Sequence, residues 1–313
     1  MYKRQDTIFP LFLFIAGVSF PYSVAKQRAG GMSEGRIYAK IVRRGLTLVV
    51  LGMVYNGLFK LDFENLRIAS VLGRIGLAWS IAAVLYLNFG VKTRAAIAVA
   101  VLAGYGALSA LVAAPDAAGA GPLTFEGNLA GYIDRQFLPG KLIYGSFDPE
   151  GLLSTVPAVV TAMLGMFTGE FVRRGDIRGG RKTLWMAAAA AALLAAGLAF
   201  SGVLPVNKKL WSSTFVCVVG AYSLGMFALF YYLIDVRGWR RWTLFFRVVG
   251  LNSITIYLAQ RIVGFGRISD FFLGGIASKC PEAVAAVISS AGYVAVCWLF
   301  LYFLYRKNVF LKV

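Results

Sequence analysis

The chain has 313 residues, of which 59% are hydrophobic and 15% charged, and its mean hydropathy is +0.71. A soluble domain is about half apolar and about a quarter charged, so this composition excludes an ordinary soluble globular enzyme. The net charge of +18 comes from basic residues scattered between apolar stretches, which indicates cytoplasmic loops of a membrane protein and not a nucleic-acid-binding helix. With no histidine, and three cysteines without a CxxC spacing, we expect neither a metal site nor a redox pair.

Nine long apolar segments follow one another along the chain. They are continuous runs, whereas the strands of a membrane β-barrel alternate polar and apolar residues. The sequence therefore predicts an all-α protein, a polytopic transmembrane helix bundle forming a single integral-membrane domain over 1–313. The expected spans are 7–25, 38–59, 67–88, 93–114, 151–173, 182–204, 210–235, 247–264 and 283–305. We expect helices to pack closely at Gly17, Gly52, Gly73, Gly165 and Gly169.

The loops predict the orientation of these spans. Most of the Lys and Arg fall in alternate loops, which the positive-inside rule assigns to the cytoplasm together with the C-terminus. The longest loop, 115–150, then lies outside, and it is too long to be a mere connector.

The chain begins with MYKRQ, which matches the translation of a transposon end used in sequencing libraries. We interpret residues 1–5 as an assembly remnant and expect the natural protein to begin upstream. Asp6 follows, directly before the first span. A carboxylate there stabilises the helix dipole by less than about 1 kcal/mol, and that role competes with a functional one.

Arg43 and Arg44, like Arg173 and Arg174, lie at expected cytoplasmic ends of spans. They can meet lipid phosphates or the phosphates of a nucleotide cofactor, and the sequence does not choose between them.

Arg74 lies seven residues after Arg67, about 10 Å further along a helix if the span begins there. An ionisable side chain deep in a span is a candidate functional group that faces a polar cavity or an anion. The alternative is a long side chain that snorkels to the membrane surface.

Asp148, Pro149 and Glu150 form a helix-start pattern, with Asp148 as N-cap, Pro149 as the first helical residue and Glu150 in the first turn. The same two carboxylates can bind a sugar or an amine at the membrane surface. Pro157 falls inside the expected helix and predicts a kink.

Two later segments combine polar groups with apolar spans. The segment 205–214 carries Asn207, Lys208 and Trp211, which suit an interface anchor or a donor-rich corner for an anion or sugar hydroxyls. Asn252 and Ser253 lie in the expected eighth span, where such residues often only hydrogen-bond a neighbouring helix.

Taken in order, several segments resemble one family, the heparan-α-glucosaminide N-acetyltransferases and their bacterial relatives. They are DTIFPLFLFIAGVSF, LRIASVLGRIGLAW, GYIDR, FDPEGLLSTVPAVVTAMLG, PVNKKLWSSTFV, IDVRGW, GLNSITIYLAQ and LYRKNVFLKV, from Asp6 to the C-terminus. Each is weak alone, but the ordered set is specific and covers essentially the whole chain.

The resemblance implies an enzyme of the bacterial inner membrane that moves an acetyl group from cytoplasmic acetyl-CoA to the amine of a glucosamine-containing sugar on the periplasmic side. It places the family's active-site histidine upstream of Asp6, after a further helix. We therefore expect the chain to be N-terminally truncated, and inactive as given. No metal is implied, and a homodimer is among the arrangements left open.

The implied roles follow from amide formation. Asp6 would orient the histidine, and Asn207, Lys208 and Asn252 would donate to the tetrahedral oxyanion. Acetyl-CoA would be held by Arg43, Arg44 and Arg74, and the acceptor sugar by Asp148, Glu150 and Trp211. The alternatives are a membrane O-acyltransferase of envelope glycans, a transporter or flippase without chemistry, and a non-functional product of a truncated gene.

Overall fold

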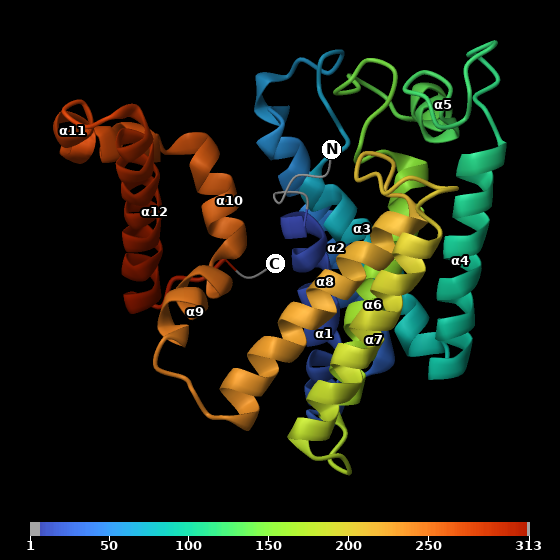
Figure 1. Cartoon of the computed structure of the whole chain (residues 1–313), viewed down its shortest axis with the longest axis horizontal. Coiled ribbons are helices and arrows are strands. Elements are labelled where there is room, and N and C mark those ends of the chain that lie inside the picture. Colours follow the sequence, from blue (N-terminus) through green and yellow to red (C-terminus); the bar gives the residue numbers. More distant parts are fainter. Residues whose placement is uncertain (1–6, 312–313) are drawn as a thin grey trace. The chain divides into compact units, whose positions relative to one another are not determined.

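The computed structural model describes residues 7–311, and these are helical with no named strand (Figure 1). The helices are α1 (Ile8–Ala29), α2 (Glu34–Tyr55), η2 (Leu58–Lys60), α3 (Val71–Asn88), α4 (Val91–Leu111), α5 (Leu129–Phe137), α6 (Leu152–Arg173), α7 (Gly179–Ala199), α8 (Ser213–Tyr231), η3 (Tyr232–Val236), α9 (Thr243–Leu251), α10 (Ser253–Ile262), α11 (Phe265–Ala277) and α12 (Glu282–Arg306). Two compact units divide the chain: unit 1 ends at Arg237 and unit 2 begins at Gly238.

Seven of the described helices are long and apolar enough to cross a membrane: α1, α3, α4, α6, α7, α12, and α8 continued into η3. The all-α membrane fold is therefore confirmed, but nine spans are not. The second expected span is present as α2, a 22-residue helix that carries four basic side chains in its first half. Because of those charges, α2 is not among the seven helices that are apolar enough to cross a membrane.

The expected eighth span, 247–264, is not one helix. It breaks at Asn252, whose backbone leaves the helical region (φ −126°, ψ 30°), so that α9 ends at Leu251 and α10 begins at Ser253. The Asn252 amide donates to the Val309 carbonyl at 3.2 Å, and its side-chain oxygen accepts from Thr255 at 3.1 Å. Helices of 9 and 10 residues are half the length that a membrane span needs.

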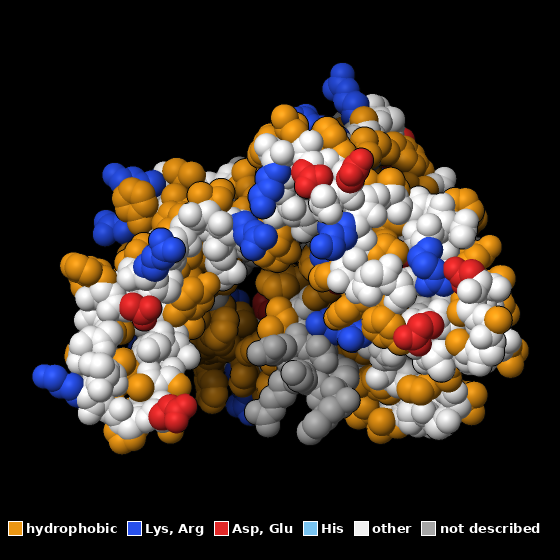
Figure 2. All heavy atoms as spheres, turned by 90° about the horizontal axis from the view of Figure 1, so that it is seen from above, with side chains coloured by type: hydrophobic (Ala, Val, Ile, Leu, Met, Phe, Trp, Pro, Cys, Tyr) orange, Lys and Arg blue, Asp and Glu red, His pale blue; other side chains and the backbone are white. Residues whose placement is uncertain are grey.

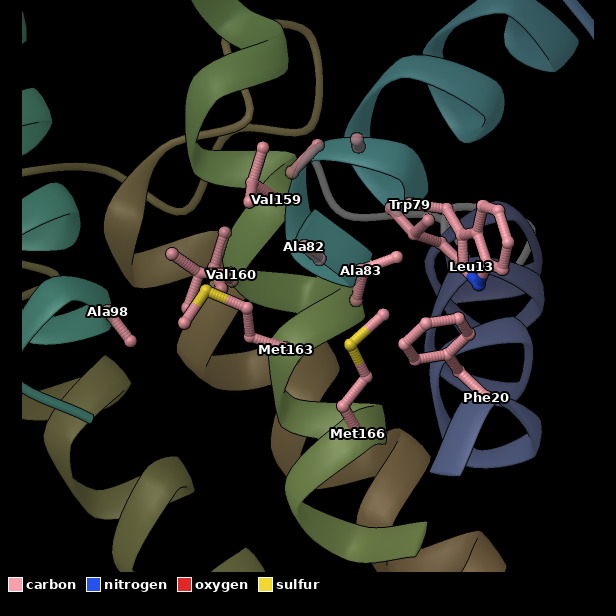
Figure 3. Close-up of a cluster of buried hydrophobic side chains, with 14 of the residues drawn as sticks. Leu13, Phe20, Trp79, Ala82, Ala83, Ala98, Val159, Val160, Met163 and Met166 are labelled. Atoms are coloured by element: carbon pink, nitrogen blue, oxygen red, sulfur yellow. The ribbon is translucent and has the colours of Figure 1, made fainter. Parts of the chain in front are cut away.

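The core of unit 1 lies where α1, α3, α6 and α8 meet. Figure 3 shows Leu13 and Phe20 of α1 facing Trp79 of α3, with Met163 and Met166 of α6 beside them. All five side chains are at least 95% buried. This apolar cluster fixes the position of the first turns of α3 and α6, where the charged side chains gather.

Glycines let the helices of this core approach closely. A Cβ atom on Gly17 of α1 would overlap the Ala162 carbonyl of α6, and one on Gly165 or Gly169 would overlap carbonyls of α1. Between α2 and α3, a Cβ on Gly52 would overlap the Ser70 hydroxyl, and Gly73 lies close to the same group. The close packing between helices is confirmed at Gly17, Gly52, Gly165 and Gly169, whereas at Gly73 the tightest contact is with Ser70, the N-cap of its own helix.

The long loop after α4 contains one short helix, α5, at one end of unit 1 (Figure 1). Asn128 caps α5, because its side-chain oxygen accepts from the backbone N–H of Gly131 at 2.7 Å. The first turns of α3 and α6 lie at this same end, since Asp134 of α5 accepts from the backbone N–H of Leu152, the first residue of α6. This is called the α5 end below.

Candidate active site at the α5 end of unit 1

Arg74 is the central side chain of the α5 end. It lies in the first turn of α3, because the residues from Arg67 to Ala69 are not helical, so the greater depth inferred by counting from Arg67 is wrong. Ser70 caps this helix by accepting from the Gly73 N–H at 2.9 Å. Arg74 is nonetheless only 2% exposed, because the neighbouring helices and loops cover it.

The partners of Arg74 are electrically neutral. Its Nη2 donates to the Ser154 hydroxyl and, at 3.5 Å, to the Gly151 carbonyl. Its Cζ lies 4.9 Å from the ring centroid of Trp211. Within residues 7–311, Nε and Nη1 of Arg74 are buried and have no hydrogen-bond partner. Buried N–H donors are nearly always paired, so these two nitrogens are suited to receive an oxygen of a ligand.

Trp211 covers one face of Arg74. It is 1% exposed, and its backbone has a positive φ of 51°, which is uncommon for a bulky residue. Its indole N–H points to the Thr161 hydroxyl at 3.4 Å, and its ring contacts Phe9 in an edge-to-face arrangement at 4.9 Å. Trp211 is therefore an inward wall of the site and not an anchor at the membrane surface.

Asp148 and Glu150 meet at one arginine. Arg67 Nε donates to Asp148 Oδ2 and Arg67 Nη2 to Asp148 Oδ1, both at 2.6 Å, and Nη2 also pairs with Glu150. Burial alone would raise the pKa of Asp148, but the hydrogen bonds and charge of Arg67 outweigh it and hold that pKa below its usual range. Asp148 is thus ionised and bonded on both oxygens.

The expected N-cap role of Asp148 is wrong. Helix α6 begins at Leu152, with Gly151 at the cap position, and Asp148 Oδ1 instead accepts from the Glu150 N–H at 2.9 Å. The predicted helix start lies three residues too early, because Arg67 binds the Asp148 carboxylate that would otherwise cap the helix.

Asp134, which was not among the predicted site residues, serves the start of α6. Its Oδ1 accepts from the Leu152 N–H at 2.9 Å and its Oδ2 from the Asp148 N–H at 3.2 Å. The side chain is fully buried, and burial raises its pKa to about 6. A Cβ on Gly151 would overlap this carboxylate, which accounts for the glycine. The GYIDR segment, quoted above for the resemblance, contains Asp134 and was the signal available.

A cavity of about 380 Å³ opens beside Arg74, between α2, α3, α4 and α6. Arg74 and Glu150 are its charged lining residues, Ser70 and Thr155 contribute hydroxyls, and the rest of its wall is mostly aliphatic. Figure 2, which views the α5 end from above, shows acidic and basic side chains among hydrophobic ones over this part of unit 1. The site combines one buried cation with an apolar pocket.

The predicted oxyanion donors belong to different units, Asn207 and Lys208 to unit 1 and Asn252 to unit 2. Asn207 shapes the loop before Trp211, since its Oδ1 accepts from the backbone N–H of Lys209 at 2.9 Å, and Lys208 lies in the same loop. Asn252 belongs to unit 2, where both polar ends of its side chain are bonded. Asp6 lies outside the described residues.

The three arginines expected to hold a cofactor are also separated. Arg44 points inward, with its Cζ 4.4 Å from the Trp79 ring centroid, whereas Arg43 is exposed on α2 beside aliphatic side chains. Arg74 lies five residues before Trp79 on α3, about 7.5 Å along the helix. Arg44 and Arg74 therefore share the interior of unit 1, and Arg43 faces out of it.

Comparison with known proteins supports the resemblance noted above. No protein-family model matches the chain. Heparan-alpha-glucosaminide N-acetyltransferase from Homo sapiens is 27% identical across 98% of this chain and 54% of its own length. The Mus musculus enzyme of the same name is 25% identical with the same coverage. The chain spans about half the length of these curated relatives, and over nearly the whole of its own length it is similar to heparan-alpha-glucosaminide N-acetyltransferases.

Proposed function

We propose that this chain carries the membrane part of an N-acetyltransferase that moves an acetyl group from acetyl-CoA to the amine of a glucosamine-type sugar. The proposed setting is a bacterial inner membrane, with the C-terminus in the cytoplasm and the α5 end on the opposite side. The observation that carries the proposal is Arg74, which is buried at a cavity and which, within residues 7–311, has two nitrogens without acceptors and no bonded carboxylate.

The chemistry explains why such a group is useful. When an amine attacks a thioester carbonyl, the oxygen gains negative charge in the tetrahedral intermediate. Donors aimed at that oxygen stabilise the intermediate, and removing one such donor typically slows a reaction about 100- to 1,000-fold. Arg74 offers Nε and Nη1 for this role, whereas the Asn252 amide nitrogen already donates to the Val309 carbonyl.

The acceptor side of the proposal rests on Glu150. Its carboxylate lines the same cavity as Arg74 and shares Arg67 with the buried Asp148. A carboxylate in this position can hold the ammonium or a hydroxyl of an amino sugar, while Asp148 keeps the loop in place. Arg44, which lies inward beside Trp79, is our candidate for a phosphate of the donor.

In the transfer itself, the carbon–sulfur bond of the thioester breaks and a carbon–nitrogen amide bond forms. The amine must lose one proton, and the leaving thiolate gains one. A positioned base speeds this exchange when its pKa is near the working pH. The resemblance assigns that base to a histidine ahead of Asp6, and Asp6 would orient it.

The test measures N-acetylglucosamine and free CoA thiol after detergent-purified protein is mixed with acetyl-CoA and glucosamine. It is run on this chain and on the longest reading frame that contains it. We expect equal amounts of both products from a protein with the histidine segment. Thiol release without N-acetylglucosamine would indicate another acceptor, and no release from either protein would overturn the proposal.

A further inference from the structure

The cavity beside Arg74 is long and amphipathic. Its wall on α3 is a stripe formed by Leu77, Ile81 and Leu85, which recur every four residues and therefore share one face of the helix. From Arg74 to Leu85 this face extends about 16 Å along the axis. Val156 and Val159 of α6 line the facing wall. One end is polar, at Arg74 and Glu150, and the rest is aliphatic.

An acetyl group fills little of such a cavity. Its single methyl group would contact the wall only next to Arg74, and the surface from Ile81 to Leu85 would stay unused. The cavity holds about 380 Å³, whereas one water molecule occupies about 30 Å³ of liquid. The geometry thus provides space for an aliphatic chain attached to the carbonyl.

The charges at the polar end favour an uncharged carbonyl over a phosphate. Arg67 and Arg74 contribute two positive charges there, and Asp148 and Glu150 contribute two negative ones. Fully buried Asp134 adds negative charge above its pKa of about 6. An anionic headgroup would therefore meet no excess of positive charge, whereas a thioester oxygen needs only the two N–H donors of Arg74.

From these observations we infer that the cavity is an acyl-chain pocket, and that the protein accepts acyl-CoA donors longer than acetyl-CoA, such as butyryl- and hexanoyl-CoA. This inference rests on the proposed transferase function. The reaction is the same: the thioester carbon–sulfur bond breaks, the amide bond forms, the amine proton leaves, and CoA departs as the thiol. Only the acyl group differs, with its carbonyl at Arg74 and its chain along Leu77 and Ile81.

Binding tests this inference without requiring turnover. Radiolabelled acetyl-CoA is displaced from detergent-purified protein by unlabelled acetyl-, butyryl- or hexanoyl-CoA. Each buried methylene contributes about 0.8 kcal/mol when fully shielded. Because the cavity is partly open, we expect hexanoyl-CoA to bind about tenfold more tightly than acetyl-CoA, with butyryl-CoA between them.

A matched pair of variants tests whether the acyl chain lies in this cavity. Ile81→Trp places a large ring in the cavity, and we expect it to remove the preference for hexanoyl-CoA. Leu229→Trp is the control, because Leu229 is as exposed as Ile81 (49% against 48%) but lies on α8, outside the cavity lining. It should keep the tenfold preference.

The outcomes separate the two proposals. Binding of acetyl-CoA with no gain for hexanoyl-CoA, or a gain that persists in Ile81→Trp, overturns the pocket and leaves the acetyltransferase intact. Failure of every acyl-CoA to bind overturns both. If native mass spectrometry finds a bilayer lipid that Ile81→Trp loses, while donor length has no effect, the cavity is a lipid site and the inference is wrong.

Discussion

Arg74 of α3 and Arg94 of α4 lie beside opposite ends of α6, and the contrast between them separates an arginine that we propose to bind a ligand from one that is paired within the fold. Arg74 contacts Ser154 near the start of the helix, and Arg94 pairs with Glu170 near its end, about 24 Å away along the axis. Both are at least 96% buried and both lie over aromatic rings. In both, Nε and Nη1 are buried and have no hydrogen-bond partner among the described residues, so burial, aromatic contact and unbonded nitrogens do not distinguish them.

Pairing does. Arg94 Nη2 lies 2.7 Å from Glu170 Oε2, so its charge is compensated within the fold. Among the described residues, Arg74 bonds to one hydroxyl and one carbonyl and to no carboxylate, and the carboxylates near it already serve Arg67 or the start of α6. An unpaired buried cation is costly, and such residues are retained where they meet a ligand. The comparison therefore supports the proposed site at the α5 end.

The largest expected effect comes from Arg74→Ala. If Arg74 donates to the reacting carbonyl, transfer of acetyl to glucosamine should fall about 100-fold or more, measured as the initial rate of N-acetylglucosamine formation. Arg74→Lys keeps the charge but not the paired donors, and should recover only part of the rate. A full rate in Arg74→Ala would remove Arg74 from the site.

Arg67→Met tests whether pairing with a carboxylate, and not position at the α5 end, decides that an arginine stabilises the fold. Arg67 lies at the α5 end like Arg74, but it is paired like Arg94. Its removal leaves buried Asp148 without a cation, and loss of one partner of a buried pair costs about 3 to 5 kcal/mol. We expect a clear fall in unfolding temperature in detergent. The double variant Arg67→Met/Asp148→Asn should recover much of it, and no recovery would contradict the pairing.

Glu170→Gln gives a smaller effect at the other end of α6. Glu170 is 39% exposed on its side chain, so water replaces part of the lost interaction, and we expect a loss of about 1 kcal/mol. The readout is the unfolding temperature together with acetyl-CoA affinity. The affinity should match the unchanged protein, and a weaker affinity would mean that Arg94 also serves the ligand.

The last expected effect is a dependence of stability on pH, which Asp134 confers. Burial raises its pKa from 3.8 to about 6, so between these values the folded state holds a proton that the unfolded state has lost. The contribution of Asp134 to stability is therefore largest at low pH and declines as pH rises through about 6, by up to about 3 kcal/mol.

Asp134→Asn isolates that contribution. The variant does not titrate, but it loses one of the two acceptors for the α6 backbone, a cost that is independent of pH. The difference in unfolding temperature between the unchanged protein and the variant should shrink from pH 4.5 to pH 7. A constant difference would show that the carboxyl pKa is not raised.

Local patterns predicted most of this fold. Long apolar runs identified the helices, because the bilayer demands about 20 apolar residues for each span. The prediction of an eighth span was wrong because the apolar stretch is continuous but the helix is not. The helix breaks at Asn252, whose side chain hydrogen-bonds Thr255 and the distant Val309. The length of an apolar stretch does not show such a break in the backbone.

The site was predicted less completely, because it depends on partners far apart in the chain. Arg74 stood out as a charge in an apolar segment, and it remains the centre of the proposed site. Asp148 was assigned as a helix cap because its true partner, Arg67, is 81 residues away. Asp134 went unnoticed because the backbone that it holds lies 14 to 18 residues later.

The glycine contacts between α1 and α6 have a consequence for how the protein is made. The two helices touch backbone to backbone, yet about 120 residues separate the end of α1 from the start of α6. At a synthesis rate of about 5 to 20 residues per second, α1 waits on the order of ten seconds for its partner to leave the ribosome. During that interval its glycine face is open to lipids and to membrane chaperones.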